Sequence, residues 1–410
     1  MKKLITLTAC LLALTCTLFT SCHDDIYYMI KQEVALEEKG ISGDIESIVR
    51  FTCDSKEYIY LTNGKLYRRD ITQASTTSGL YNEQWERIIN PSDSSSDFAG
   101  EQIIYLASDS TYLYAMTTSY EEDDNGYNVQ SYRKIYCTKK GFPSSKADWT
   151  DITETLGISK SNVGTTASVD QIKTLFSNRA YEQTNRKAYV RLYNIAGDSA
   201  THIYQLNGEN APSLIADGTN NASSSSIQAV YFNGSDYFTG TKATAANDKY
   251  IYYTSGSALY YADSYDASSN AFLTGSESAK SVALDKGQIL DIAVSKDFLL
   301  LGTVNGIAHV TLDANSIPAS ATTAFTNNAV STLTSAYRVY TVFSRDPYVN
   351  EYDNDLWGTT TIYGSLSSSS TSGLFNELGL WAYYPDRTAS GSTYGTWNKD
   401  GTADGESKGN

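Results

Sequence analysis

Residues 58–67, YIYLTNGKLY, decide the fold class of this chain. A tyrosine-rich apolar run reaches Asn63-Gly64, and a second apolar run follows directly. Tyrosine and the branched apolar residues favour strands. An Asn-Gly pair between two such runs is typical of a tight hairpin, because glycine accepts the positive φ that the turn requires. The stretch therefore predicts two antiparallel strands joined by a short turn.

The same pattern recurs along the chain, at residues 250–263 with a Ser-Gly turn and at residues 299–310 with an Asn-Gly turn. A short segment of the form apolar-x-x-apolar also recurs, starting at Ile45, Ile103, Ile172, Ile227, Ile289 and Val339. The steps between these starts are 58, 69, 55, 62 and 50 residues. This regularity predicts six repeats, each with an inner strand, a hairpin and a more variable outer strand. We expect residues 85–88 and 149–152 to be outer strands of the first two repeats.

Repeats of roughly 40 to 60 residues with three or four antiparallel strands are the arrangement of a β-propeller blade. Over residues 41–386 the chain resembles the broad β-propeller class, although its motifs match no named repeat family. The resemblance implies an all-β ring of six blades, or of seven if the 69-residue step contains a degenerate copy. A pair of β-sandwiches or a β-helix would give similar strands.

The first residues are arranged as a signal peptide. Two lysines at positions 2 and 3 precede an apolar run over residues 4–19, and the small residues Thr20 and Ser21 precede Cys22. The run is shorter than the roughly 20 residues that a membrane-spanning helix needs. Phe19-Thr20-Ser21-Cys22 resembles the lipobox of bacterial lipoproteins, with Phe where Leu is usual.

The lipobox resemblance implies that residues 1–21 are removed and that the thiol of Cys22 carries lipid. An ordinary secretory signal is the alternative. The next residues, His23-Asp24-Asp25, resemble the acidic export tags of surface lipoproteins in Bacteroidetes, and spirochaetes are the other host group with similarly relaxed lipoboxes. The resemblance implies attachment to the outer membrane with the protein at the cell surface. A periplasm-facing protein with a solvated acidic linker is the alternative.

Residues 22–40 are the expected tether between the lipid and the repeats. Within it, residues 26–35, IYYMIKQEVA, are either a stalk or a strand that closes the ring beside residues 380–384. At the other end, residues 387–410 are rich in Gly, Ser, Thr and Asp, which predicts a flexible polar tail.

The charge of the chain excludes one class of partner. Without residues 1–21, 29 basic residues stand against 46 acidic ones, a net charge of −17. Because such a surface repels phosphates, we expect no nucleic-acid binding. Cys53 and Cys137 are the cysteines that remain beside Cys22, and they either form one disulfide or are free and buried.

Catalytic and metal-binding motifs are scarce. The sequence contains no HExxH, GxSxG or P-loop motif, and His202 and His309 stand inside strand patterns. No cofactor is implied. Three acidic stretches, at residues 121–126, 350–355 and 400–405, offer oxygen-rich loops that suit calcium. The alternative for each stretch is a solvated hairpin tip.

Aromatic residues are the remaining indication of a binding surface. Tyr and Trp present flat, amphipathic faces to sugars and proteins at modest entropic cost. The candidate contacts are Trp85, Trp149, Trp357 and Trp381, with packing between blades as the alternative role. We therefore expect a non-enzymatic module that binds a glycan, a protein or another envelope component. A propeller glycoside hydrolase or lyase with pocket carboxylates, or a scaffold subunit, would also fit this sequence.

Overall fold

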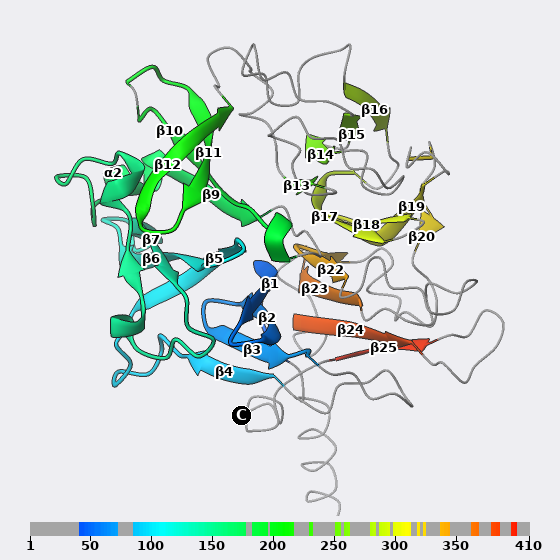
Figure 1. Ribbon diagram of the computed structural model, residues 1–410, viewed down its shortest axis with the longest axis horizontal. Coiled ribbons are helices and arrows are strands. Elements are labelled where there is room, and N and C mark those ends of the chain that lie inside the picture. Colours follow the sequence, from blue (N-terminus) through cyan, green and yellow to red (C-terminus); the bar gives the residue numbers. More distant parts are fainter. Residues whose placement is uncertain are drawn as a thin grey trace, which may run out of the picture.

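Figure 1 shows the computed structural model of the protein. It describes residues 41–72, 85–177, 183–195, 197–216, 229–232, 251–255, 258–262, 279–283, 287–295, 298–312, 318–319, 323–324, 337–344, 362–368, 379–385 and 395–399. These residues form antiparallel β-sheets with a few short helices, which confirms the predicted all-β class.

The first three sheets each contain four strands that pair in chain order. Sheet 1 consists of β1 (Ser47–Cys53), β2 (Lys56–Thr62), β3 (Leu66–Asp70) and β4 (Glu86–Ile89). Sheet 2 consists of β5 (Glu101–Ser108), β6 (Leu113–Glu122), β7 (Asn128–Thr138) and β8 (Thr150–Asp151). Sheet 3 consists of β9 (Ile172–Ser177), β10 (Ala188–Tyr193), β11 (Thr201–Asn207) and β12 (Asn210–Ala216). The connections contain η1 (Lys146–Asp148), η2 (Glu154–Leu156), α2 (Thr166–Gln171) and η3 (Gln183–Asn185).

The last three sheets repeat this order, with one extra strand in the final sheet. Sheet 4 consists of β13 (Ala229–Phe232), β14 (Ile251–Ser255), β15 (Ala258–Ala262) and β16 (Ala279–Ala283). Sheet 5 consists of β17 (Ile289–Ser295), β18 (Phe298–Thr303), β19 (Gly306–Thr311) and β20 (Thr323–Ala324). Sheet 6 consists of β21 (Tyr337–Arg338), β22 (Val342–Ser344), β23 (Ile362–Ser368), β24 (Gly379–Pro385) and β25 (Gly395–Lys399). Both β21 and β22 pair with β23.

The sheets follow one another around a shared centre, with β1, β5, β9, β13, β17 and β22 innermost (Figure 1). Contacts between these inner strands run from β9 through β5, β1, β22 and β17 to β13. Ser47 Oγ of β1 donates to Leu106 O of β5 at 3.1 Å, and Thr341 Oγ1, just before β22, donates to Asp291 Oδ2 of β17 at 2.8 Å. The six apolar-x-x-apolar segments lie in or directly beside these inner strands, except that Ile227 and Gln228 are outside the described residues.

The predicted Asn-Gly hairpins form between β2 and β3 and between β18 and β19. Gly64 and Gly306 have φ of 94° and 92°, in the region that favours glycine. Each hairpin also contacts the next sheet, because Ile103 N donates to Gly64 O and Val339 N donates to Thr303 O, both at 2.9 Å. The hairpin therefore fixes the sheet it belongs to and its neighbour. The predicted outer strands are confirmed as well, as β4 and β8.

The two ends of the described chain meet at sheet 6. Leu380 N donates to Ile41 O at 2.9 Å, and Ile45 N donates to Ser365 Oγ at 2.9 Å. The segment predicted to close the ring, residues 26–35, lies outside the described residues. Residues 41–46 make this junction with the last sheet.

One predicted boundary is wrong. Residues 387–410 were expected to be a flexible tail, but β25 lies inside this range and pairs with β24 along its length, Trp397 opposite Tyr383. Its strand-favouring threonine and tryptophan are surrounded by Gly, Ser and Asp, so composition alone hides the strand.

Candidate functional site

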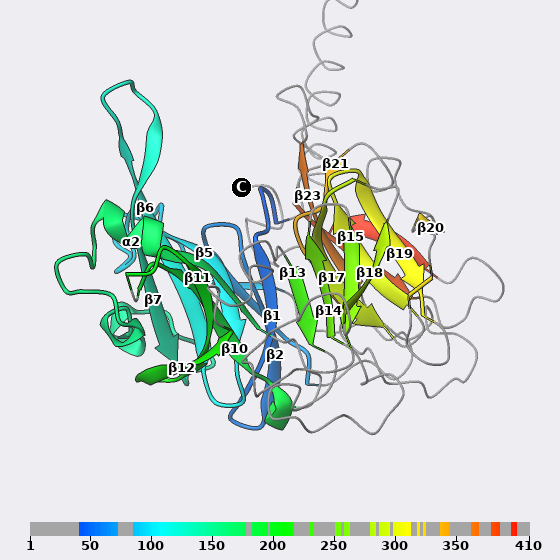
Figure 2. The same cartoon turned by 90° about the horizontal axis from the view of Figure 1, so that it is seen from above.

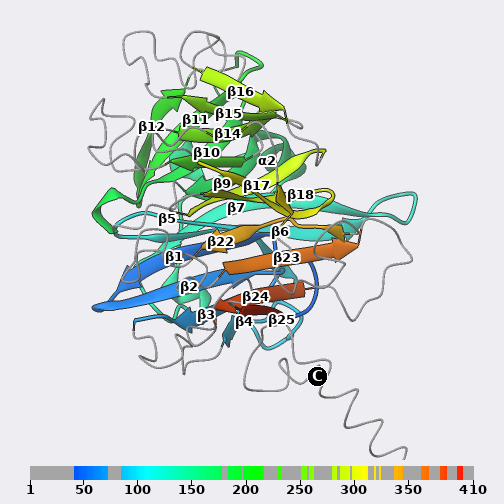
Figure 3. The same cartoon turned by 90° about the vertical axis from the view of Figure 1, so that its right-hand side faces the viewer.

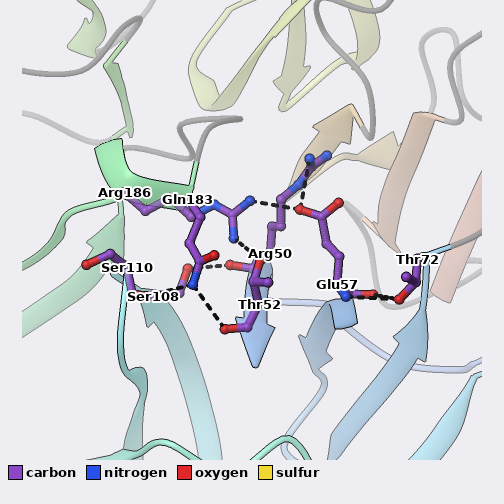
Figure 4. Close-up of polar contacts among 8 residues, drawn as sticks. All are labelled: Arg50, Thr52, Glu57, Thr72, Ser108, Ser110, Gln183 and Arg186. Atoms are coloured by element: carbon purple, nitrogen blue, oxygen red, sulfur yellow. Dashed lines mark hydrogen bonds and ion pairs between the residues drawn. The ribbon is translucent and has the colours of Figure 1, made fainter. Parts of the chain in front are cut away.

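Charged side chains form a buried cluster where the inner strands finish, which we call the central cluster (Figure 4). Arg50 of β1 and Arg186, directly after η3, both contact the carboxylate of Glu57 in β2. Arg186 Nη2 lies 2.8 Å and Arg50 Nη1 lies 3.4 Å from the same oxygen, Glu57 Oε1. The side chain of Arg186 is 2% exposed, that of Arg50 is 5% exposed, and that of Glu57 is 27% exposed.

The connection between β9 and β10 carries Arg186 from sheet 3 to sheet 1. Arg186 Nη1 donates to Thr52 Oγ1 at 2.8 Å. On the same connection, Gln183 Nε2 donates to Ser110 O at 2.9 Å and lies 3.4 Å from Thr52 O. Figure 4 shows these contacts reaching the last residues of β1 and the β5–β6 turn. The connection therefore ties three sheets together near the centre.

Sheet 6 joins the same cluster through an aromatic ring. The guanidinium of Arg50 lies 5.8 Å from the ring centroid of Phe343 in β22, within cation–π range. Since both guanidiniums are almost fully buried, their ion pairs join parts of the chain to each other. The cluster has the geometry of a structural ion-pair network.

The opposite end of the inner strands carries a projecting hairpin, residues 120–130, which we call the arm. β5 pairs with β6 only as far as Ser119, and β8 pairs with β7 only at Tyr136 and Cys137. Beyond Ser119 the two strands pair with each other alone among the described strands. Figures 2 and 3 show the arm extending away from the sheets.

The tip of the arm is an ordered turn. Asp123 N donates to Tyr127 O at 2.8 Å, and Asp123 Oδ1 accepts from the backbone N–H groups of Asn125 at 2.9 Å and Tyr127 at 2.8 Å. These backbone hydrogen bonds hold the pKa of the Asp123 carboxyl below its usual value, so it is charged at neutral pH. Gly126 has φ of 80°, which completes the turn.

The first predicted acidic stretch, residues 121–126, is therefore a hairpin tip. Among the residues that the structure describes, no group of three or more His, Cys, Asp or Glu side chains is placed to hold a metal ion. The other two acidic stretches, residues 350–355 and 400–405, lie outside the described part of the chain.

A half-buried carboxyl lies at the arm end of the inner strands. Burial raises the pKa of Glu46, just ahead of β1, to about 7, and the charge of Asp44 contributes in the same direction. Its charge in turn contributes to a raised pKa of Tyr105 in β5, for which burial is the main cause. The carboxyl of Glu46, beside the inner strands, therefore gains or loses its proton near pH 7.

Three of the four predicted aromatic contacts lie in the core. Trp85, Trp149 and Trp381 are 2%, 7% and 7% exposed. The ring of Trp85 packs edge-on against Tyr363 with centroids 5.8 Å apart, and Trp149 Nε1 donates to Pro143 O at 3.1 Å. At these positions the burial fits the packing role that the sequence left open as the alternative. Trp357 lies outside the described residues.

The cysteines and histidines also have structural surroundings. Cys53 and Cys137 are free thiols and do not form a disulfide with each other. Burial raises the pKa of Cys137 to about 12. His202 Nε2 lies 2.6 Å from Asp198 Oδ2, and the ring of His309 packs on a neighbouring phenylalanine. Cys22, the predicted lipidation site, lies outside the described residues.

No protein-family model matches the chain, and no curated protein matches it either. Within the part of the chain that the structure describes, no helix is long and apolar enough to span a membrane.

Proposed function

We propose that the protein is a lipid-anchored extracytoplasmic binding module whose sheets are the six blades of a β-propeller. The observation that carries this proposal is the circular order of the sheets, with β1, β5, β9, β13, β17 and β22 innermost. Sheets arranged in this way present turns and loops at both ends of a rigid scaffold, where binding residues are usually found.

The anchor belongs to the same proposal. Residues 41–46 enter at the end of the inner strands that carries the arm, so a tether over residues 22–40 leads from lipid on Cys22 to this end. The acidic residues after Cys22 favour export to the outer membrane and display at the cell surface, with a periplasm-facing protein as the alternative. The ligand is a glycan, a protein or another envelope component.

Membrane fractionation tests the anchor. The wild-type chain should sediment with membranes, and Cys22→Ser should release it into the soluble fraction. Retention of the Cys22→Ser protein in the membrane fraction would overturn the proposed lipid attachment.

A paired screen tests the binding role. The full chain is applied to a glycan array and to a panel of envelope proteins, and is assayed in parallel for glycoside hydrolysis and elimination. Saturable binding without turnover is the expected result. Turnover that a single Asp or Glu substitution abolishes would replace the binding proposal with a propeller hydrolase or lyase.

A further inference from the structure

The arm exposes apolar side chains that the sheets leave uncovered. Tyr127 at the tip is 70% exposed, and Val129 and Tyr120 in its strands are 43% and 40% exposed. They account for three of the five large apolar side chains that are exposed in the described part of the chain. Tyrosine is enriched in the contact surfaces of proteins, so the exposed Tyr120 and Tyr127 mark the ribbon as a place where a partner can bind.

The side chains of Tyr120 and Gln130 are held in place within the arm. Gln130 Nε2 donates to the Tyr120 hydroxyl at 3.3 Å, while Gln130 Oε1 accepts from Arg133 Nε at 2.9 Å. A β-bulge at Ser131 separates the arm from the rest of sheet 2, since Ser119 pairs with Tyr132 and Tyr120 pairs with Gln130. An ordered ribbon loses little conformational freedom when a partner binds it.

Each face of the arm combines an apolar group with a carboxylate. Tyr120 and Glu122 are two residues apart on one strand and therefore share a face of the ribbon. Glu121 and its cross-strand partner Val129 share the other face. Asp124 adds a further exposed carboxylate at the tip. A matching segment would alternate apolar and basic side chains on the face that it turns to the arm.

The basic residues at the base of the arm are directed elsewhere. Arg133 Nη1 donates to Ile172 O at 2.7 Å and to Lys173 O at 3.0 Å. Lys134 Nζ lies 3.9 Å from Asp151, at the outer edge of sheet 2. Within the described residues, Glu121 and Glu122 form no ion pair. Charge complementarity therefore favours a cationic occupant.

We propose that the arm docks a basic, extended segment of a partner protein, which adds along the ribbon next to Tyr120 and Glu122 and reaches Tyr127 at the tip. This inference rests on the proposed binding function and names the partner class. The unpaired strand edges beyond Ser119 offer backbone hydrogen bonds to an added strand, and the carboxylates select lysine or arginine side chains. A second copy of this chain would bring like charges together, and anionic lipid would be repelled.

A peptide titration tests the docking proposal on the full chain. The probe is a short peptide of repeating Thr-Val-Thr-Lys, labelled for fluorescence anisotropy, and the control peptide replaces lysine with glutamate. The Lys peptide should bind and the Glu peptide should not. Tyr127→Ser with Tyr120→Ser, and separately Glu121→Gln with Glu122→Gln, should each weaken binding by roughly tenfold. Added salt should weaken it mainly in the wild-type chain.

A matched variant separates the arm from the overall negative charge. Glu154→Gln with Glu209→Gln removes two exposed carboxylates from other surfaces and should leave peptide affinity unchanged. Equal binding by the arm variants and the wild type would overturn the proposal. So would arm-dependent self-association in sedimentation, or arm-dependent binding to phosphatidylglycerol vesicles. Because the titration reads only the arm, its failure is distinguishable from turnover in the activity screen, which would overturn the binding function itself.

Discussion

The two ends of the inner strands use charged residues in opposite ways. At the central cluster, Arg50 and Arg186 share one oxygen of Glu57, and both arginines are almost fully buried. On the arm, Glu121 and Glu122 are exposed and form no ion pair with the other described residues. A buried charge must be compensated by neighbouring groups, whereas an exposed charge keeps its hydration and can meet a partner. The charges of the central cluster therefore stabilise the fold, whereas the carboxylates of the arm are available to a partner.

The largest expected effect comes from breaking the shared contact at the central cluster. Glu57→Gln removes the carboxylate that two buried guanidiniums share, and should lower the free energy of unfolding by about 2–4 kcal/mol. Denaturant unfolding measures the change. Glu122→Gln on the arm is the matched control and should stay within about 0.5 kcal/mol of the wild type. Similar losses of unfolding free energy for Glu57→Gln and Glu122→Gln would contradict the assignment of different roles to the central cluster and the arm.

Close packing at the same end gives the next effect. A Cβ at Gly141 would lie 2.5 Å from Cys53 Sγ at the end of β1, and Gly141 O accepts from the Tyr60 hydroxyl at 2.7 Å. Since that bond restrains the backbone, Gly141→Ala should cost about 1–3 kcal/mol of unfolding free energy. Adding Cys53→Ala removes the clash and should recover most of the loss. Additive losses in this double-mutant cycle would contradict the proposed clash.

At the arm end, the expected effect depends on pH. The folded pKa of Glu46 is about 7 against a usual 4.5, so folding takes up a proton between these values and stability falls as pH rises through that window. Glu46→Gln removes this penalty. Its free energy of unfolding should exceed that of the wild type by about 1–3 kcal/mol at pH 8 and be nearly equal to it at pH 4. A difference that does not vary with pH would show that Glu46 ionises normally.

The smallest effect is expected for the arm itself. Tyr127→Ser should change the free energy of unfolding by less than about 0.5 kcal/mol, because the ring is 70% exposed. The contrasting variant is Tyr60→Phe, which loses the hydrogen bond to Gly141 O and should cost about 1 kcal/mol. Chemical unfolding of both proteins gives the comparison. A clear loss for Tyr127→Ser would mean that the tip packs on the protein.

Much of the fold could be predicted from the sequence because local chemistry determines it. An Asn-Gly pair between apolar runs requires a tight turn, and β2–β3 and β18–β19 form as expected. The location of the tryptophans was harder to predict, because a large amphipathic ring can pack in the core or lie at a binding surface. Trp85 and Trp149 are buried in the core.

The sites were less predictable. The acidic run between tyrosine-rich strands did indicate a hairpin tip, but the length of the arm depends on where β5 and β8 stop pairing. The central cluster gave no signal in the sequence, because Glu57 and Arg186 are 129 residues apart. Such contacts depend on the arrangement of the sheets, which the repeat pattern does not determine.

The junction between Ile41 and sheet 6 has a mechanical consequence. A pull on the chain ahead of Ile41 passes first into the Leu380 N–Ile41 O bond and then into Ile45 N–Ser365 Oγ, where the first and last sheets meet. These bonds join residues more than 300 positions apart, so a pull from the N-terminal side would load the junction between the first and last sheets. Under traction from the N-terminal side, we expect the molecule to open between its first and last sheets before any single sheet unravels.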